Sequence, residues 1–216
     1  FDPVETPNDV FPQVIEGLID VEEWIRFFAL QSLIVNEDGA IQNRSGEDYF
    51  LYKVPAASGR PDAGKWLLVP WDLEESFQTS TQRLFASQVR SIKRLLTHPQ
   101  FAPLYYEEIL SLRDGAFSRQ QMRQRFSLID FSFGFSTTDA IETFVTERAG
   151  FVDSSVPLEI QAGPASPGEG LAGCGDTLYA TSDLVSLSGR SNASLTRSVK
   201  VGGQPAAHDP VTAAWA

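Results

Sequence analysis

The sequence predicts an α+β protein, in which a mainly helical lobe carries one small β-hairpin and precedes a linker and the first strands of a β-sandwich-like module. Three observations support this prediction. Apolar residues recur at helical spacing over much of residues 21–154, two β-type runs lie close together at 48–70, and Gly, Pro, Ala and Ser dominate 161–175. We therefore expect a lobe at 1–160, a linker at 161–175 and a strand-rich domain at 176–216.

The first predicted helix runs from Val21 to about Val35, after a Pro-rich start. Asp20 followed by Glu23 has the form of a helix N-cap with its capping-box partner. Apolar residues cover more than one face of this helix, so we expect most of it to be buried. The turn-forming sequence NEDG at 36–39 ends it.

Two strands are predicted next, at 48–54 (DYFLYKV) and 65–70 (KWLLVP). The connection between them contains Pro, Gly and Ser, so the two strands should form a β-hairpin. Apolar residues at helical spacing then predict four helices, at about 79–97, 103–113, 118–129 and 137–154.

The segment at 161–175 has a composition that buries little apolar surface, so it is interpreted as a linker. Beyond it, short β-type runs are separated by Gly and Pro; they are 177–180, 184–188, 195–201 and 212 onward. A complete immunoglobulin-like sandwich takes about 100 residues. We therefore expect this segment to be the start of a truncated Ig- or fibronectin-like domain.

Composition excludes several classes of function. The formal net charge of −11 argues against nucleic acid and anionic membranes as partners, because both attract clustered Lys and Arg. No apolar stretch approaches the roughly 20 residues of a membrane span. The single cysteine and two histidines exclude a cysteine-based zinc site and a histidine cluster. An acidic protein can still bind a nucleotide when divalent cations lie between its carboxylates and the phosphates.

Three acids follow breaks in predicted regular structure. Asp38 follows the first helix, Asp48 begins the hairpin, and Asp72 follows its second strand. Phosphoryl transfer needs carboxylates that hold divalent metal and one that orients the attacking hydroxyl. The interval from Asp38 to Asn43 also has the D-x-x-x-x-N spacing of a protein-kinase catalytic loop. The alternative is structural, since Asp is common in turns and at strand ends.

Four sequence blocks, in order, resemble the CotH-type (spore-coat-protein-H-like) atypical protein kinases. They are DVEEWIRFFA at 20–29, NEDG at 36–39, DYFLY at 48–52 and VPWDLEESF at 69–77. The sequences LTHPQF at 96–101 and FVTER at 144–148 are similar to later helices of that family. The resemblance covers about residues 13–157.

The resemblance implies a kinase-like C-terminal lobe from a secreted or surface-associated enzyme. Such an enzyme transfers the γ-phosphate of ATP to Ser or Thr of a protein substrate, with Mg²⁺ or Mn²⁺. Asp38 then corresponds to the catalytic aspartate and Asp72 to the metal-binding aspartate. Asp48, at a position where the family often has Asn, and Asn43 compete for the role of further metal ligand.

A kinase normally clamps the phosphates with a Lys and a Gly-rich loop that precede the catalytic loop. Ahead of Asp38 the only basic residue is Arg26, and no Gly-rich loop is present. We therefore expect this chain alone to be inactive and a longer parent protein to carry the activity. The alternative function is a non-catalytic surface or adhesion scaffold, in which the β-rich segment takes part in binding.

Overall fold

The structure is a computed structural model that describes residues 6–39, 48–134, 136–165, 171–174, 177–180 and 185–216. The predicted α+β class is confirmed. In chain order the helical lobe contains α1 (Phe11–Glu16), α2 (Val21–Ile34), β1 (Tyr49–Lys53), the short 3-10 helix η1 (Ala56–Ser58), β2 (Trp66–Pro70), α3 (Arg90–Thr97), α4 (Ala102–Asp114), α5 (Arg119–Phe133) and α6 (Thr138–Ser155). Within the described residues, no helix is long and apolar enough to pass through a membrane.

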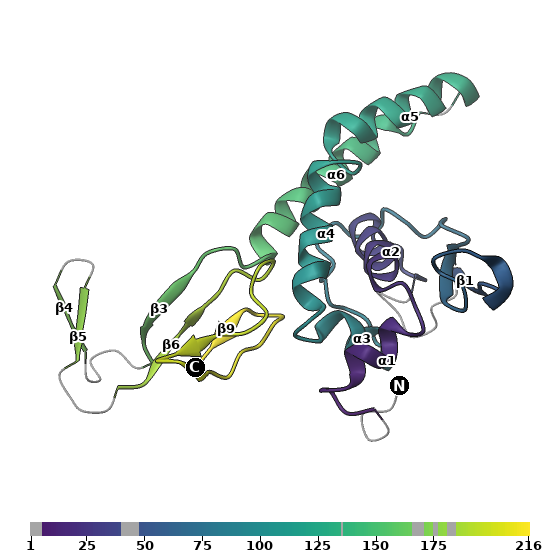
Figure 1. The fold of residues 1–216 in the computed structure, drawn as a ribbon. Coiled ribbons are helices and arrows are strands. Elements are labelled where there is room, and N and C mark those ends of the chain that lie inside the picture. Colours follow the sequence, from purple (N-terminus) through teal and green to yellow (C-terminus); the bar gives the residue numbers. More distant parts are fainter. Residues whose placement is uncertain (1–5, 40–47, 135, 166–170, 175–176, 181–184) are drawn as a thin grey trace.

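Helix α2 is the buried centre of the lobe, as predicted. The Asp20 side chain accepts a hydrogen bond from the backbone N–H of Glu23 at 3.2 Å, which caps the helix N-terminus. Its inner face packs against α4, where Phe28 meets a core that includes Tyr105 and Ile109, all three fully buried. Figure 1 shows the two helices lying beside one another. This packing fixes the C-terminal end of α2, from which the turn at 36–39 leaves.

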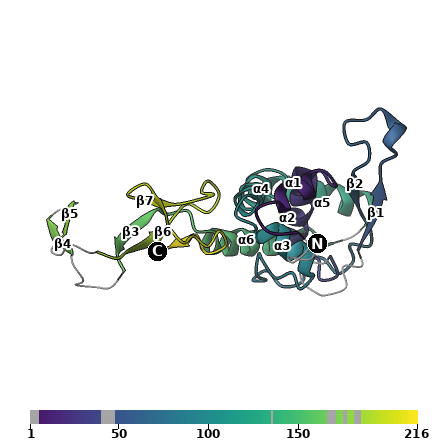
Figure 2. The same ribbon diagram turned by 60° about the horizontal axis from the view of Figure 1, so that its bottom comes forward.

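The predicted hairpin is also confirmed. Strands β1 and β2 pair antiparallel, with Leu51 opposite Leu68. The Tyr49 ring packs edge-on against Phe28, and the Trp66 N–H donates to the Leu18 carbonyl at 2.8 Å. Both ends of the strand pair thus contact the lobe, and the connection between the strands projects from it (Figure 2).

The helix predicted over 79–97 is only half correct, because α3 begins at Arg90. The reason lies in the backbone carbonyls of the earlier half. Those of Ser80 and Gln82 accept hydrogen bonds from Arg148, and that of Leu84 accepts one from the Tyr105 hydroxyl at 2.7 Å. Side chains from α4 and α6 therefore hold this segment in an irregular path.

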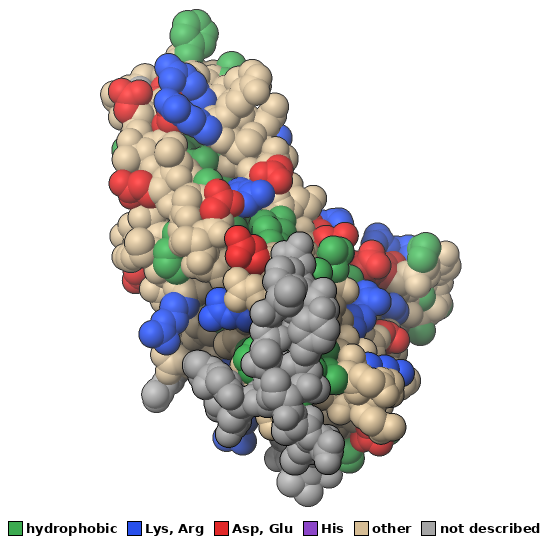
Figure 3. All heavy atoms as spheres, turned by 90° about the vertical axis from the view of Figure 1, so that its left-hand side faces the viewer, with side chains coloured by type: hydrophobic (Ala, Val, Ile, Leu, Met, Phe, Trp, Pro, Cys, Tyr) green, Lys and Arg blue, Asp and Glu red, His purple; other side chains and the backbone are tan. Residues whose placement is uncertain are grey.

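Helices α5 and α6 form an antiparallel pair that projects from the lobe (Figure 1). Among the described side chains of α5 none is buried, and several apolar ones are exposed, namely Leu128, Ile129, Phe131 and Phe133. Figure 3 shows a hydrophobic side chain at this end of the molecule, above a group of Lys and Arg side chains. Glu142 of α6 forms ion pairs with Arg119 and Arg123 of α5, which join the two helices.

The C-terminal part contains short strands, namely β3 (Gln161–Pro164), β4 (Leu171–Cys174), β5 (Thr177–Ala180), β6 (Leu187–Arg190), β7 (Lys200–Val201), β8 (Gln204–Pro205) and β9 (Ala214–Trp215). The largest sheet has the order β3-β6-β9. The prediction that 161–175 lacks regular structure is therefore wrong for β3 and β4. The error has a backbone cause: β3 has few apolar side chains, but its pairing with β6 satisfies its hydrogen bonds.

This C-terminal part packs on the helical lobe. Ala193 and Ala213 belong to the same buried core as the helices, and the Tyr106 hydroxyl donates a hydrogen bond of 2.5 Å to the Val211 carbonyl. Figures 1 and 2 both place the part beside α4 and α6, at the end opposite the hairpin. The domain boundary near 160 and the truncated Ig-like domain remain predictions.

Candidate active site

The turn that carries Asp38 lies alongside the segment that follows Asp72. The Glu37 N–H donates to the Glu75 carbonyl at 3.2 Å, and the Phe77 N–H donates to the Ile34 carbonyl at 2.6 Å. Because these bonds join the end of α2 to residues 75–77, two positions far apart in sequence become neighbours. The backbone therefore brings together two of the predicted site segments.

Asp48 joins the same place. Its N–H donates to the Asp38 carbonyl at 3.4 Å, and its carbonyl accepts from the Trp71 N–H at 3.0 Å. Asp48 is buried, with 7% of its surface exposed, whereas Asp38 is half-buried and Asp72 is exposed. Asn43, the fourth predicted site residue, lies outside the described residues.

Backbone strain is concentrated around these acids. Among the described residues four that are not glycine have a positive φ, and three of them lie here, namely Val35 (51°), Asp72 (47°) and Phe77 (65°). A left-handed backbone is tolerated by Asp more readily than by most residues and is least favourable for β-branched Val, so the strain lies mainly at Val35 and Phe77. Strain of this kind persists where packing enforces it, and it is common at functional sites.

Asp72 and Glu74 form a close pair of carboxyl groups. The pKa of Glu74 is raised because its protonated carboxyl can donate a hydrogen bond to Asp72, and because Asp72, Glu75 and Asp48 carry negative charge nearby. Among the described residues neither Asp72 nor Glu74 forms an ion pair with Lys or Arg. Sequence reasoning missed Glu74, although its place two residues after Asp72 was a usable signal.

The donor set fits a divalent cation that is shared with a nucleotide. Within the part of the chain that the structure describes, no group of three or more His, Cys, Asp or Glu side chains is arranged to hold a metal ion. Mg²⁺, however, is usually held by one or two carboxylates plus substrate phosphates and water, without a complete protein cage. The uncompensated pair of Asp72 and Glu74 meets that requirement.

Two buried amides beneath the Asp38 turn have atoms without hydrogen-bond partners. Asn36 is fully buried with both amide atoms unpaired, and the Gln31 Oε1 atom is unpaired as well. A Cβ atom added to Gly39 would lie 2.6 Å from Gln31 Oε1 and 3.1 Å from Asn36 Nδ2. The turn therefore sits directly on these amides, and a side chain at position 39 would require the buried Gln31 side chain to move. Sequence reasoning did not identify either amide.

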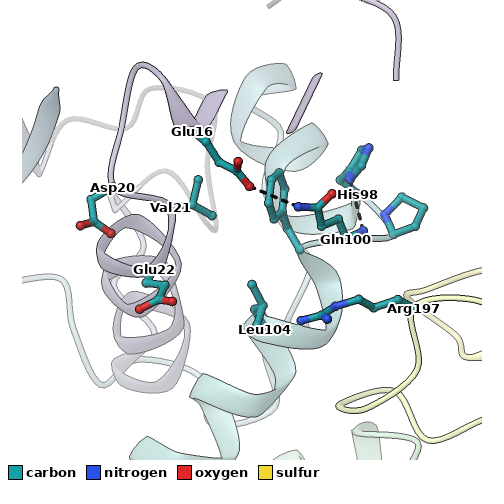
Figure 4. Close-up of a pocket in the computed structure, with 10 residues that line it drawn as sticks. Glu16, Asp20, Val21, Glu22, His98, Gln100, Leu104 and Arg197 are labelled. Carbon is teal, nitrogen blue, oxygen red and sulfur yellow. Dashed lines mark hydrogen bonds between the residues drawn. The ribbon is translucent and has the colours of Figure 1, made fainter. Parts of the chain in front are cut away.

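A cavity of about 760 Å³ lies away from these acids, between the helices and the C-terminal part. In Figure 4, Glu16, Asp20 and Glu22 come from the α1–α2 side, and Arg197 reaches in from the C-terminal part. Gln100 donates to Glu16 at 3.2 Å. This cavity shares none of the predicted catalytic acids, so it is a separate feature.

The family model described as CotH kinase protein matches residues 2–130, which is more than half of the chain. The chain belongs to the CotH kinase protein family. The resemblance identified from the sequence blocks is thus confirmed. No curated protein and no solved structure matches the chain.

In this member of the CotH kinase family, the matched residues include the hairpin and the three described acids, Asp38, Asp48 and Asp72. They also include Glu74. Helix α6 and the whole C-terminal part lie after the matched residues. The candidate site is therefore carried by the family region, whereas part of its structural support comes from outside it.

Proposed function

We propose that this chain supplies the acid-bearing half of an atypical protein kinase active site, which transfers the γ-phosphate of ATP to a Ser or Thr hydroxyl of a protein. The observation that carries the proposal is the backbone hydrogen bonding that joins the segments of Asp38, Asp48 and Asp72. Membership of the CotH kinase family supports the reaction type.

Each acid has a distinct role in this proposal. Asp38, half-buried on its turn, orients the substrate hydroxyl and accepts its proton. Asp72 and Glu74 present the carboxylates that would hold Mg²⁺ or Mn²⁺, and the buried Asp48 adds negative charge beside them. When bound, the cation neutralises charge on the ATP phosphates. Asn43 remains a candidate for a further ligand.

The surroundings and location of the enzyme are part of the same proposal. ATP and a protein substrate are its partners, and the family likeness supports a location outside the cell or at the cell or spore surface. A Lys and a Gly-rich loop that clamp the phosphates are absent from this sequence ahead of Asp38. We therefore expect the 216 residues alone to show no robust metal-dependent phosphorylation.

The test uses the natural polypeptide that contains this chain, at its full length, with labelled ATP and Mn²⁺. Asp38→Ala and Asp72→Ala should each lower labelling of the protein substrate by about 100-fold or more, because one removes the base and the other a cation ligand. Asp9→Ala removes an exposed acid outside the site and should leave labelling unchanged. Unchanged labelling in both site variants would remove the assignment.

A second candidate function is a non-catalytic surface scaffold with a kinase-like lobe. The observation that favours it is the 760 Å³ cavity, whose wall combines both parts of the chain. Under this reading the full-length protein shows no metal-dependent labelling with ATP, and Arg197→Ala weakens the binding of a partner protein. Labelling that depends on Asp38 and Asp72 would eliminate the scaffold reading.

A further inference from the structure

Arg148 on α6 is the largest fully buried side chain among the described residues, with no exposed surface. Its guanidinium donates hydrogen bonds to three backbone carbonyls, at 2.7 Å to Ser32, 2.9 Å to Ser80 and 2.5 Å to Gln82. It also lies 5.1 Å from the Phe151 ring centroid. One side chain thus connects three helical or irregular segments.

Burying a charged guanidinium without an ion pair costs free energy, which is hard to explain if Arg148 serves packing alone. Arg148 forms no ion pair with any described carboxylate, and its Nε atom has no hydrogen-bond partner. Burial lowers its pKa to about 10. Buried cations are normally paired, and an unpaired one is tolerated where it satisfies several other groups.

The three carbonyls belong to the two segments that frame the candidate site. Ser32 lies in the last turn of α2, which leads directly into the Asp38 turn. Ser80 and Gln82 lie a few residues after Phe77, whose N–H donates to the Ile34 carbonyl and ends the Asp72 segment. Arg148 therefore clamps the far ends of the same two segments that the backbone bonds join.

We propose that Arg148 is a positioning residue, which holds the Asp38 turn and the Asp72 segment in register, so that the Asp72 and Glu74 carboxylates can hold a cation beside Asp38. This inference rests on the proposed function. It also goes beyond the family match, because α6 lies after residue 130, where that match ends. The site then depends on a helix that the matched region does not contain.

The test titrates Mn²⁺ together with ATP into the whole 216-residue chain and follows binding by isothermal titration calorimetry. Arg148→Met removes the three hydrogen bonds and should weaken Mn²⁺ binding by about 10- to 100-fold, as loss of outer-shell support typically does. Arg148→Lys keeps the charge but not the fork of donors, so it should recover part of the affinity. All titrations are made at a temperature where every variant is folded.

Tyr106→Phe is the matched control. It also removes a hydrogen bond to a backbone carbonyl, that of Val211, but at the contact with the C-terminal part. It should lower the melting temperature while leaving Mn²⁺ affinity within about twofold. Wild-type affinity in Arg148→Met, or an equal loss in Tyr106→Phe, would overturn the positioning role.

Hydrogen exchange separates this inference from the proposed function. In Arg148→Met the amides of Glu37 and Phe77 should exchange faster than in wild type, and in Tyr106→Phe they should not. If wild type binds no Mn²⁺, the proposed metal site fails, and the exchange rates still decide whether Arg148 holds the two segments. Unchanged exchange in Arg148→Met would refute the clamp itself.

Discussion

Single substitutions can test the electrostatic environment of Glu74. Its pKa is raised by Asp72 and the neighbouring acids. A carboxyl group whose pKa rises on folding destabilises the folded state above that pKa, and this penalty disappears as pH falls to its ordinary value of 4.5. Without divalent cation, Glu74→Gln should therefore raise the melting temperature at about pH 7.

The gain in Glu74→Gln should shrink steadily as the pH falls toward 4.5, in thermal unfolding followed by circular dichroism. Glu107→Gln is the control, since it removes an exposed carboxylate from α4. It should change the melting temperature little at neutral pH. A Glu74→Gln variant that is less stable than wild type at neutral pH would contradict the like-charge pair.

Gly39 is the second residue whose environment makes a sharp prediction. A Cβ atom there would meet Gln31 Oε1 at 2.6 Å, inside a buried region. Gly39→Ala should therefore destabilise the protein by about 1–3 kcal/mol in denaturant unfolding, as overpacking does. In a Gln31→Ala background, where the atom that the Cβ would meet is absent, Gly39→Ala should cost less stability than it does in wild type.

Gly150 supplies the matched control for Gly39. It lies inside α6, and a Cβ atom there would meet nothing within 4 Å. Gly150→Ala should therefore stabilise the protein by about 0.5–1 kcal/mol, because Ala has the better helix propensity. Equal effects of the two substitutions would mean that the turn does not rest on the buried amides.

At the residue scale, the sequence predicted the site acids but not the buried residues that hold their segments in place. Asp38, Asp48 and Asp72 each follow a visible break in regular structure, so their adjacency could be anticipated. Arg148 lies in the family-like sequence FVTER at 144–148, but its role could not be recognised, because its partners are backbone carbonyls, which carry no sequence signal. The unpaired amide of Asn36 depends on burial, which the turn sequence does not reveal.

Among the elements, the α5–α6 connection is held by one carboxylate. Asp130 accepts hydrogen bonds from the hydroxyl of Thr137 at 2.8 Å and the N–H of Thr138 at 2.9 Å. Bonds from Thr138 and Thr137 lower the pKa of Asp130 to about 2. The acid thus caps the N-terminus of α6 from the end of α5.

This cap predicts a defined pH dependence. A depressed pKa gives stability that is complete above the ordinary value of 3.8 and is lost as pH falls toward about 2. Asp130→Asn should melt below wild type at neutral pH, and the two should converge over that acid range. Asp139→Asn, in the first turn of the same helix, is the control, since it removes an acid while leaving the bonds of Asp130 in place, and it should lower the melting temperature less at neutral pH. If the difference in melting temperature between Asp130→Asn and wild type were the same at every pH, the cap would be contradicted.

Elements were predicted well where local pattern and tertiary packing agree. Helix α2 has both a cap and an apolar surface, and the hairpin has two β-type runs, so both were placed within a few residues. Residues 79–89 carry helical periodicity, but the carbonyls that helix formation needs are taken by Arg148 and Tyr105. Strand β3 was missed because its pairing with β6 gives it order that its own composition does not signal.

At the scale of the whole molecule, the C-terminal part shares a core with the helices. Ala193 and Ala213 are buried in that core, and Tyr106 is hydrogen-bonded across the contact. Removing residues 161–216 should therefore expose apolar surface on α4 and lower the melting temperature of the helices by several degrees. Circular dichroism of the two chain lengths measures this. An unchanged melting temperature would support an independent domain after the predicted linker.

The central claim is that backbone hydrogen bonds join the segments of Asp38, Asp48 and Asp72, so that the Asp72 and Glu74 carboxylates can hold a divalent cation together with ATP phosphates. Isothermal titration of Mn²⁺ with ATP into the 216-residue chain tests it most directly, with Asp72→Asn and the exposed Asp9→Asn as a matched pair. The account predicts saturable binding that Asp9→Asn retains and Asp72→Asn weakens by about tenfold or more. Equal binding by both variants, or none by the wild type, would contradict it.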